Sequence, residues 1–129
     1  MRVLAVLLLS LVLQGCYEVN RDCTAYRTGI FEFEAASGTE IFTTRIERFD
    51  TLEIEYFKDQ VDTASIRWIN DCEYILKKLN PRNRAEKKAI HIKILTTSDK
   101  AYEFEFNEVG KSQKSRAKAR KIKDLPAKP

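Results

Sequence analysis

A two-residue alternation of apolar and polar side chains is the feature that most constrains this chain. In "GIFEFEA", Phe31 and Phe33 alternate with glutamates, and the later stretch "YEFEFN" repeats the pattern with three aromatic residues. Successive side chains of a β-strand point to opposite faces of the sheet, so this period predicts strands with one buried and one solvated face. The chain is therefore expected to be all-β.

The same alternation predicts which face of each strand lies in the core. In "TLEIEYF" we expect Leu52, Ile54 and Tyr56 to face the core. The intervening Glu53 and Glu55 are then expected in water, where carboxylates keep a sheet face soluble. By the same argument, the other predicted core residues include Phe31, Phe33, Phe42, Ile46, Ala64, Ile66, Trp68, Ile90, Ile92, Ile94, Tyr102, Phe104 and Phe106.

Short turn signals between these stretches predict an antiparallel meander, because parallel strands need long crossover connections. Seven strands are expected, or eight if Ser115–Ile122 continues the sheet. Such a sheet would form a small lipocalin-like barrel or a strongly curled sheet within one domain, residues 28–123. The turns are expected at Ser37-Gly38, Lys58-Asp59, Asn80-Pro81, Ser98-Asp99 and Val109-Gly110.

The N-terminus, "MRVLAVLLLSLVLQGC", predicts export. Arg2 precedes the apolar run Val3–Leu13, whose helix of about 16 Å is too short to span a bilayer, as is usual for a signal peptide. "LQGC" resembles the lipobox of bacterial lipoproteins, which implies removal of a signal helix at residues 1–15 and lipidation of Cys16. The alternative is an ordinary signal with a chance cysteine. Residues 16–27 are then expected to be a lipidated tether.

The other two of the three cysteines form a candidate pair. If Cys16 carries lipid, Cys23 and Cys72 remain, and an exported protein meets conditions that permit disulfides. A buried free thiol and a catalytic nucleophile are the alternatives for Cys72. Its neighbours Asp71 and Glu73 disfavour the thiolate that a nucleophile needs, so the disulfide is preferred.

No cofactor or metal site is expected. One histidine and two distant cysteines match no known spacing of metal ligands, and the chain has no glycine-rich phosphate loop. A small barrel has room for its own side chains or for one small ligand. The aromatic residues are therefore predicted to be core, with ligand lining as the alternative: Tyr56, Trp68, Tyr102, Phe104 and Phe106.

The C-terminal segment carries most of the positive charge. Residues 16–110 hold 14 Lys and Arg against 18 Asp and Glu, whereas residues 111–129 hold eight against one. This segment is a candidate contact for an anionic surface, and a merely solvated strand is the alternative. Nucleic acid is not expected as a partner of an exported chain, and residues 124–129 are expected to be a disordered tail. The candidate contacts are Lys114, Arg116, Lys118, Arg120 and Lys121.

Several segments together resemble a known family. Cys16, Cys23, "TGIFEFE", "IRWINDCEYILKKLNP", "AEKKAIHIKILTT" and "YEFEFN" are similar to short lipoproteins of Bacteroidetes, flavobacteria in particular. The resemblance implies a last strand, in which Ala117 stands near the place of a family glycine, and it implies no established activity. Some short members carry the name DNA topoisomerase IV, but this one-domain exported chain has neither the nucleotide-binding nor the DNA-cleaving domain of such an enzyme.

The sequence therefore predicts a non-enzymatic protein, lipid-anchored to the periplasmic side of the outer membrane, that binds a small ligand or a protein partner. A structural or assembly role through the basic segment is the alternative. A cavity lined by Tyr and Phe would favour the ligand role, and an exposed apolar patch over a filled interior would favour protein contact. Convergent carboxylates, or His91 in a deep pocket, would favour an enzyme.

Overall fold

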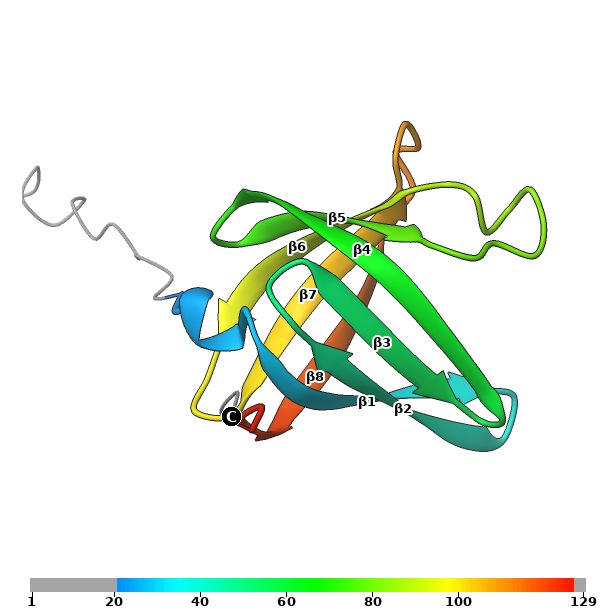
Figure 1. Cartoon of the computed structure of the whole chain (residues 1–129). Coiled ribbons are helices and arrows are strands. Elements are labelled where there is room, and N and C mark those ends of the chain that lie inside the picture. Colours follow the sequence, from blue (N-terminus) through cyan, green and yellow to red (C-terminus); the bar gives the residue numbers. More distant parts are fainter. Residues whose placement is uncertain (1–20, 127–129) are drawn as a thin grey trace, which may run out of the picture.

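The structure, a computed structural model, describes residues 21–126. Eight antiparallel strands follow one another around a closed barrel, which β1 and β8 complete (Figure 1). The predicted all-β meander is thus confirmed, with a closed barrel instead of an open curled sheet. The elements are η1 (Thr24–Tyr26), β1 (Gly29–Ser37), β2 (Glu40–Arg48), β3 (Leu52–Phe57), β4 (Gln60–Asn70), β5 (Glu73–Lys78), β6 (Ile90–Thr97), β7 (Ala101–Glu108) and β8 (Ser115–Lys123).

The eighth strand is the one that closes the barrel. Within β8, Ala117 and Ala119 lie opposite Phe104 and Tyr102 of β7, and Ala119 also lies opposite Phe33 of β1. Ala119 is fully buried. Alternation of small inward residues with basic outward ones therefore lets a highly charged segment act as a strand, because only its alanines enter the crowded interior.

The core consists of inward side chains from all parts of the barrel. Phe31 and Tyr102 meet edge to face with their ring centroids 5.7 Å apart, and Phe33 meets Phe104 in the same way at 6.3 Å. Full burial of such a side chain stabilises the fold by about 1.5–3 kcal/mol. The buried apolar cluster comprises Cys23, Tyr26, Phe31, Ile46, Ile66, Tyr74, Ile92, Ile94, Tyr102, Phe104 and Ala119.

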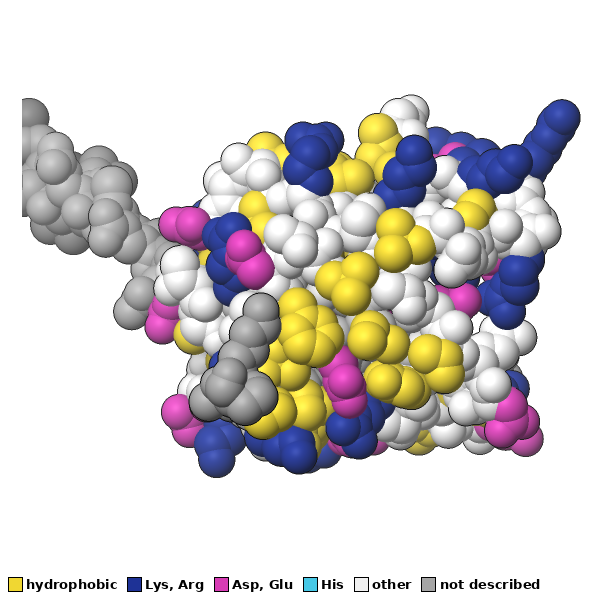
Figure 2. Space-filling model, in the orientation of Figure 1, with side chains coloured by type: hydrophobic (Ala, Val, Ile, Leu, Met, Phe, Trp, Pro, Cys, Tyr) yellow, Lys and Arg dark blue, Asp and Glu magenta, His cyan; other side chains and the backbone are white. Residues whose placement is uncertain are grey.

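The predicted orientation of β3 is wrong. Its register places Glu53 opposite Arg48 and Glu55 opposite Ile46, so both carboxylates face the interior. Tyr56 lies opposite Arg45 on the outer face, which it shares with Leu52 and Ile54. Hydrophobic side chains gather on this β2–β4 side of the barrel (Figure 2). The short turn after β2 fixes the register, and the burial of Arg48 provides a partner that keeps Glu53 inside.

A short N-terminal segment closes one end of the barrel. A disulfide joins Cys23 to Cys72 at the start of β5, as predicted, with a Cα–Cα distance of 5.2 Å. Tyr26 of η1 is 3 % exposed, and its hydroxyl donates a hydrogen bond to the carbonyl oxygen of Ser98. The structured domain therefore begins before residue 28, and the end of the predicted tether is part of the core.

The structure describes only part of the predicted N-terminal and C-terminal segments. The predicted signal helix, residues 1–15, and Cys16 lie outside the described residues. Of the predicted tail, the structure describes residues 124–126, which follow β8, and Lys121 Nζ lies 2.6 Å from Asp124 Oδ1. Residues 127–129 also lie outside the described part. Among the residues that the structure describes, no helix has the length and apolar character needed to cross a membrane.

Candidate functional site

The interior of the barrel contains a cavity of about 190 Å³. Its walls are mainly aromatic and aliphatic, and three charged side chains contribute to them. The cavity is lined by Phe33, Ile46, Arg48, Glu53, Glu55, Tyr74, Leu76, Ile90, Ile92, Tyr102, Phe104 and Phe106. An apolar cavity with few polar groups is typical of sites for small molecules.

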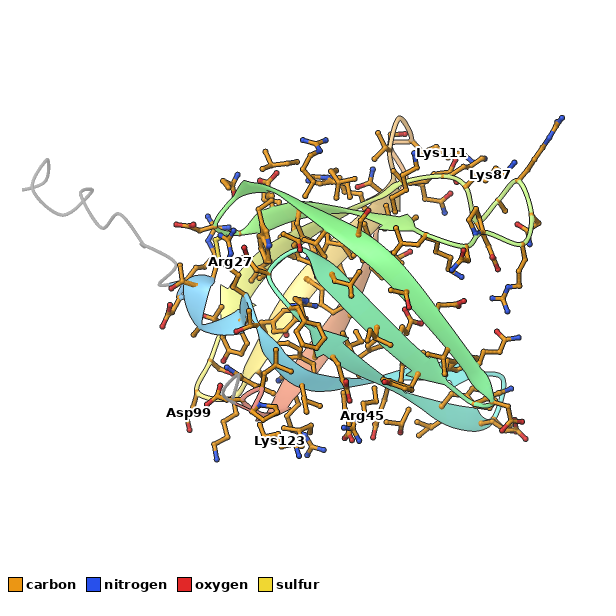
Figure 3. All side chains as sticks on the ribbon, in the orientation of Figure 1. Arg27, Arg45, Lys87, Asp99, Lys111 and Lys123 are labelled. Atoms are coloured by element: carbon orange, nitrogen blue, oxygen red, sulfur yellow. A yellow bond between two sulfur atoms is a disulfide. The ribbon has the colours of Figure 1, made fainter. Side chains whose placement is uncertain are left out.

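A second pocket adjoins the cavity and forms its mouth. The two share four lining residues, Glu53, Glu55, Leu76 and Ile90. The mouth is also lined by Ala85, Glu86 and Lys88, from the connection between β5 and β6. In Figure 3, Lys87 and Lys111 mark this end of the barrel, and Arg27 marks the opposite end beside η1. The barrel thus has one closed end and one end that carries the mouth.

Ion pairs fix the β5–β6 connection at the mouth. Lys78 Nζ lies 2.9 Å from Asp62 Oδ2 and 3.5 Å from Glu86 Oε1. Arg82 Nη2 lies 3.0 Å from the same Glu86 oxygen. Hydrogen bonds from the backbone and side chain of Arg82 lower the pKa of Glu86 to about 2. Glu86 is therefore ionised at neutral pH and keeps these cations in place.

A buried ion pair lies at the inner end of the cavity. Arg48 and Glu53 are 1 % and 4 % exposed, and Arg48 Nε donates to Glu53 Oε2 at 2.7 Å. The guanidinium also donates to the Tyr26 carbonyl oxygen at 3.0 Å and to the Tyr102 hydroxyl at 2.9 Å. It lies over the ring of Phe31, 4.6 Å from the ring centroid. All three guanidinium nitrogens therefore have partners within the protein.

Glu55 is the other charged group that faces the cavity. Burial raises its pKa, and the nearby carboxylates of Glu53 and Asp62 raise it further, whereas the positive charge of Lys78 opposes them. Within residues 21–126, the Glu55 carboxylate forms no hydrogen bond or ion pair. The nearby Lys78 forms its ion pairs with Asp62 and Glu86 instead. Glu55 thus presents an unpaired carboxylate at the junction of cavity and mouth.

The structure separates the five predicted aromatic residues into three groups. Tyr102, Phe104 and Phe106 line the cavity. Trp68 is partly buried against the core, where it packs on Tyr74 at 4.6 Å between centroids. Its indole nitrogen donates to the Asp50 carbonyl oxygen near the closed end. Tyr56 lies outside the barrel, which contradicts both roles proposed for it.

The alternation of apolar and polar residues does not predict the polar part of the site. Arg48, Glu53 and Glu55 were not predicted to lie inside, although one signal was present. Arg48 continues the same strand parity as Thr44 and Ile46, both of which are buried. An arginine in a row of buried positions indicates a buried partner of opposite charge, and the partner is five positions away across the turn.

The predicted basic contacts do not form one free surface. Lys114 Nζ lies 2.8 Å from Glu105 Oε1, and Lys121 Nζ donates to the Ala25 carbonyl oxygen at 2.9 Å. Arg116, Lys118 and Arg120 occupy alternate positions of β8 that point outward, and Arg120 lies 3.5 Å from Glu32. Three of the five predicted contacts, Lys114, Arg120 and Lys121, therefore have partners within the protein.

The groups considered for metal binding and catalysis lie elsewhere. His91 Nε2 is 3.1 Å from Glu73 Oε2 on the outer face of the sheet, away from the cavity. Over residues 21–126, His, Cys, Asp and Glu side chains form no group of three or more with a metal-binding arrangement.

In comparisons of the whole chain, no protein-family model, curated protein or solved structure matches it.

Proposed function

We propose that this chain is a non-enzymatic, lipid-anchored envelope protein that binds a small, mainly apolar ligand inside its barrel. The observation that carries the proposal is the interior cavity, whose Phe and Tyr walls adjoin a mouth at one end. Removal of an apolar ligand from water into such walls is favourable by about 25 cal/mol per Å² of buried apolar surface.

The cavity sets the size of the ligand. An apolar cavity of about 150 Å³ can hold one benzene molecule. A cavity of about 190 Å³ therefore suits a ligand of one ring with a few further atoms, and the adjoining mouth leaves room for a polar group at one end. A long acyl chain would exceed this space.

The geometry supports binding more than catalysis. Glu53 and Glu55 both face the cavity, which is the arrangement that would suggest a two-carboxylate enzyme. Glu53, however, is engaged by Arg48 at 2.7 Å and is almost fully buried. Among residues 21–126, Glu55 is then the one carboxylate of the cavity that is free to contact a ligand. A two-carboxylate mechanism would need a second free group, whereas binding needs only one.

An assembly role has less support. Each of the eight strands pairs on both sides, so the described part of the chain offers no free sheet edge for a partner strand. Lys114 and Lys121 of the basic segment already contact groups of the same protein. The outer apolar residues of β3 remain as a candidate contact surface, but nothing identifies a partner for them.

The location is proposed from the N-terminal sequence. "LQGC" before Tyr17 suggests a lipid on Cys16, and two or more acyl chains anchor a protein stably. The disulfide between Cys23 and Cys72 supports an oxidising compartment. We therefore place the protein on the periplasmic side of a bacterial outer membrane.

Cavity filling tests the proposed binding. Leu76 lines both the cavity and the mouth, so Leu76→Phe would occupy ligand space. The matched control is Leu79→Phe, at a residue that is 51 % exposed. With 2-phenylethanol as the probe in calorimetry, binding should be lost in Leu76→Phe and kept in Leu79→Phe. Equal affinity in both variants, or no binding to the unchanged protein, would contradict the proposal.

A further inference from the structure

We propose that the barrel selects ligands that carry a protonated amine, with Glu55 as the group that holds the ammonium. This inference rests on the proposed ligand-binding function and specifies the chemical class of the ligand. It starts from the contrast between Glu55, whose carboxylate has no partner among residues 21–126, and Arg48, whose three nitrogens all have one.

The inner end of the cavity offers no cation for an anionic ligand. The Arg48 guanidinium is held by Glu53, by the Tyr26 carbonyl oxygen and by the Tyr102 hydroxyl. It is also enclosed by the rings of Phe31 and Tyr74, at 4.6 and 5.1 Å from their centroids. A ligand carboxylate would have to displace a charged partner that is itself buried, which is strongly unfavourable.

The cations at the mouth are also engaged. Lys78 pairs with Asp62 at 2.9 Å, and Lys88 Nζ lies 2.8 Å from Glu108 Oε1. Arg82 pairs with Glu86 at 3.0 Å. An anionic ligand that enters the mouth therefore meets basic groups whose charges are already neutralised by protein carboxylates.

Glu55 is placed to receive a cation. It lies opposite Ile46 on one side and Asp62 on the other, and it lines both the cavity and the mouth. Glu55 is part-buried, so its carboxylate loses some of its hydration, and no cation in the described part of the chain lies within 4.0 Å to offset this cost. A ligand ammonium at this point would form a charge-assisted hydrogen bond and offset that cost.

The aromatic walls fit the remainder of such a ligand. Phe33, Phe104 and Phe106 line the cavity that Glu55 borders, and the centroids of Phe104 and Phe106 are 5.9 Å apart. Their faces bury an apolar ring, and an aromatic face attracts a nearby cation. The expected ligand is therefore a primary amine on a short arm attached to one ring.

Three probes of similar size test this selectivity by calorimetry at pH 7. They are 2-phenylethylamine, 2-phenylethanol and 3-phenylpropanoate, which present an ammonium, a hydroxyl and a carboxylate on comparable frames. The amine should bind about tenfold more tightly than the alcohol, because a charge-assisted hydrogen bond replaces a neutral one. The carboxylate should bind most weakly of the three.

Two variants with the same change of charge assign the effect to one residue. Glu55→Gln should remove the preference for the amine, so that the amine and the alcohol bind this variant with affinities within about twofold of each other. Glu34→Gln changes a carboxylate on the exposed outer side of β1 and should keep the preference.

The outcomes separate this inference from the function on which it rests. Binding of the alcohol without preference for the amine would overturn the amine selectivity and leave ligand binding intact. A preference that survives in Glu55→Gln, or is lost equally in Glu34→Gln, would overturn the role of Glu55. Failure of all three probes to bind the unchanged protein would overturn both proposals.

Discussion

Arg48 and Glu53 form an ion pair that is sealed inside the barrel, with Nε and Oε2 2.7 Å apart across the turn between β2 and β3. The pair holds together three parts of the closed end. Arg48 binds the carbonyl oxygen of Tyr26 in η1 and the hydroxyl of Tyr102 in β7. The interior at this end is therefore organised by charge as well as by apolar packing.

Removal of one member of this pair should be strongly destabilising. Glu53→Gln leaves the Arg48 charge buried without a counter-charge, and such changes cost about 3–5 kcal/mol. Glu32→Gln is the matched control, because its pair with Arg120 is exposed and is worth less than about 1 kcal/mol. Urea unfolding at pH 7 measures both free energies. Equal losses in the two variants would show that the buried pair does not stabilise the closed end.

The disulfide should contribute a large share of the stability. It closes a loop between residues 49 positions apart, and bridges of this kind contribute about 2–4 kcal/mol, mainly through constraint of the unfolded chain. The double variant Cys23→Ala/Cys72→Ala should lose this amount in urea unfolding. Reductant should lower the stability of the unchanged protein towards the same value and leave the double variant unaffected. Sensitivity of the double variant to reductant would contradict this explanation.

The stability contribution of Glu55 should depend on pH. Its pKa is raised above the ordinary value of 4.5, so the folded protein holds this proton more tightly than the unfolded chain does. Stability from this group is fully present below the unfolded pKa and is lost as the pH rises through the folded pKa. Glu55→Gln should therefore be more stable than the unchanged protein at pH 7.

Thermal unfolding between pH 3.5 and 8 measures this effect. The gain in Tm of Glu55→Gln should shrink as the pH falls through the range above 4.5, because the carboxyl then becomes protonated and neutral like the amide. A gain that is constant with pH would point to a packing difference instead of ionisation.

Membrane attachment should depend on Cys16. Cys16→Ala removes the thiol that is expected to receive lipid, so the protein should move to the soluble fraction after an alkaline wash. Gln14→Ala, two residues earlier in the sequence, preserves the cysteine and should leave the protein with the membranes. Retention of Cys16→Ala on washed membranes would contradict lipidation at this residue.

The fold was largely predictable because alternation is a local property. The pattern in Phe31 and Phe33 predicts a strand, and short turns predict antiparallel neighbours. The sequence alone does not decide whether Ser115–Ile122 is a strand, because this segment is rich in charge. Only its pairing with both β1 and β7 shows that the alanines face inward. Closure involves residues far apart in the sequence, which no local pattern reports.

The site was only partly predictable, for a related reason. Tyr102 and Phe104 were expected inside because their strand alternates aromatic with charged residues. In β3 the two faces carry apolar residues and glutamates, and the apolar face was assumed to be the core. The register with Arg48 reverses this choice. Either face of β3 could be buried, and its pairing with β2 decides which one is. The inward positions of Glu53 and Glu55 therefore follow only from the β2–β3 register.

The disulfide also determines which end of the barrel lies near Cys16, the expected site of lipid attachment. Cys16 lies only seven positions before Cys23, a distance of at most about 25 Å in extended chain, and Cys23 is tied to the closed end. A protein held by lipid at Cys16 would therefore stand with its closed end towards the bilayer and its mouth towards the aqueous phase. Its ligand would arrive by diffusion through water, which suits capture of a dissolved compound and not extraction of a lipid from the membrane.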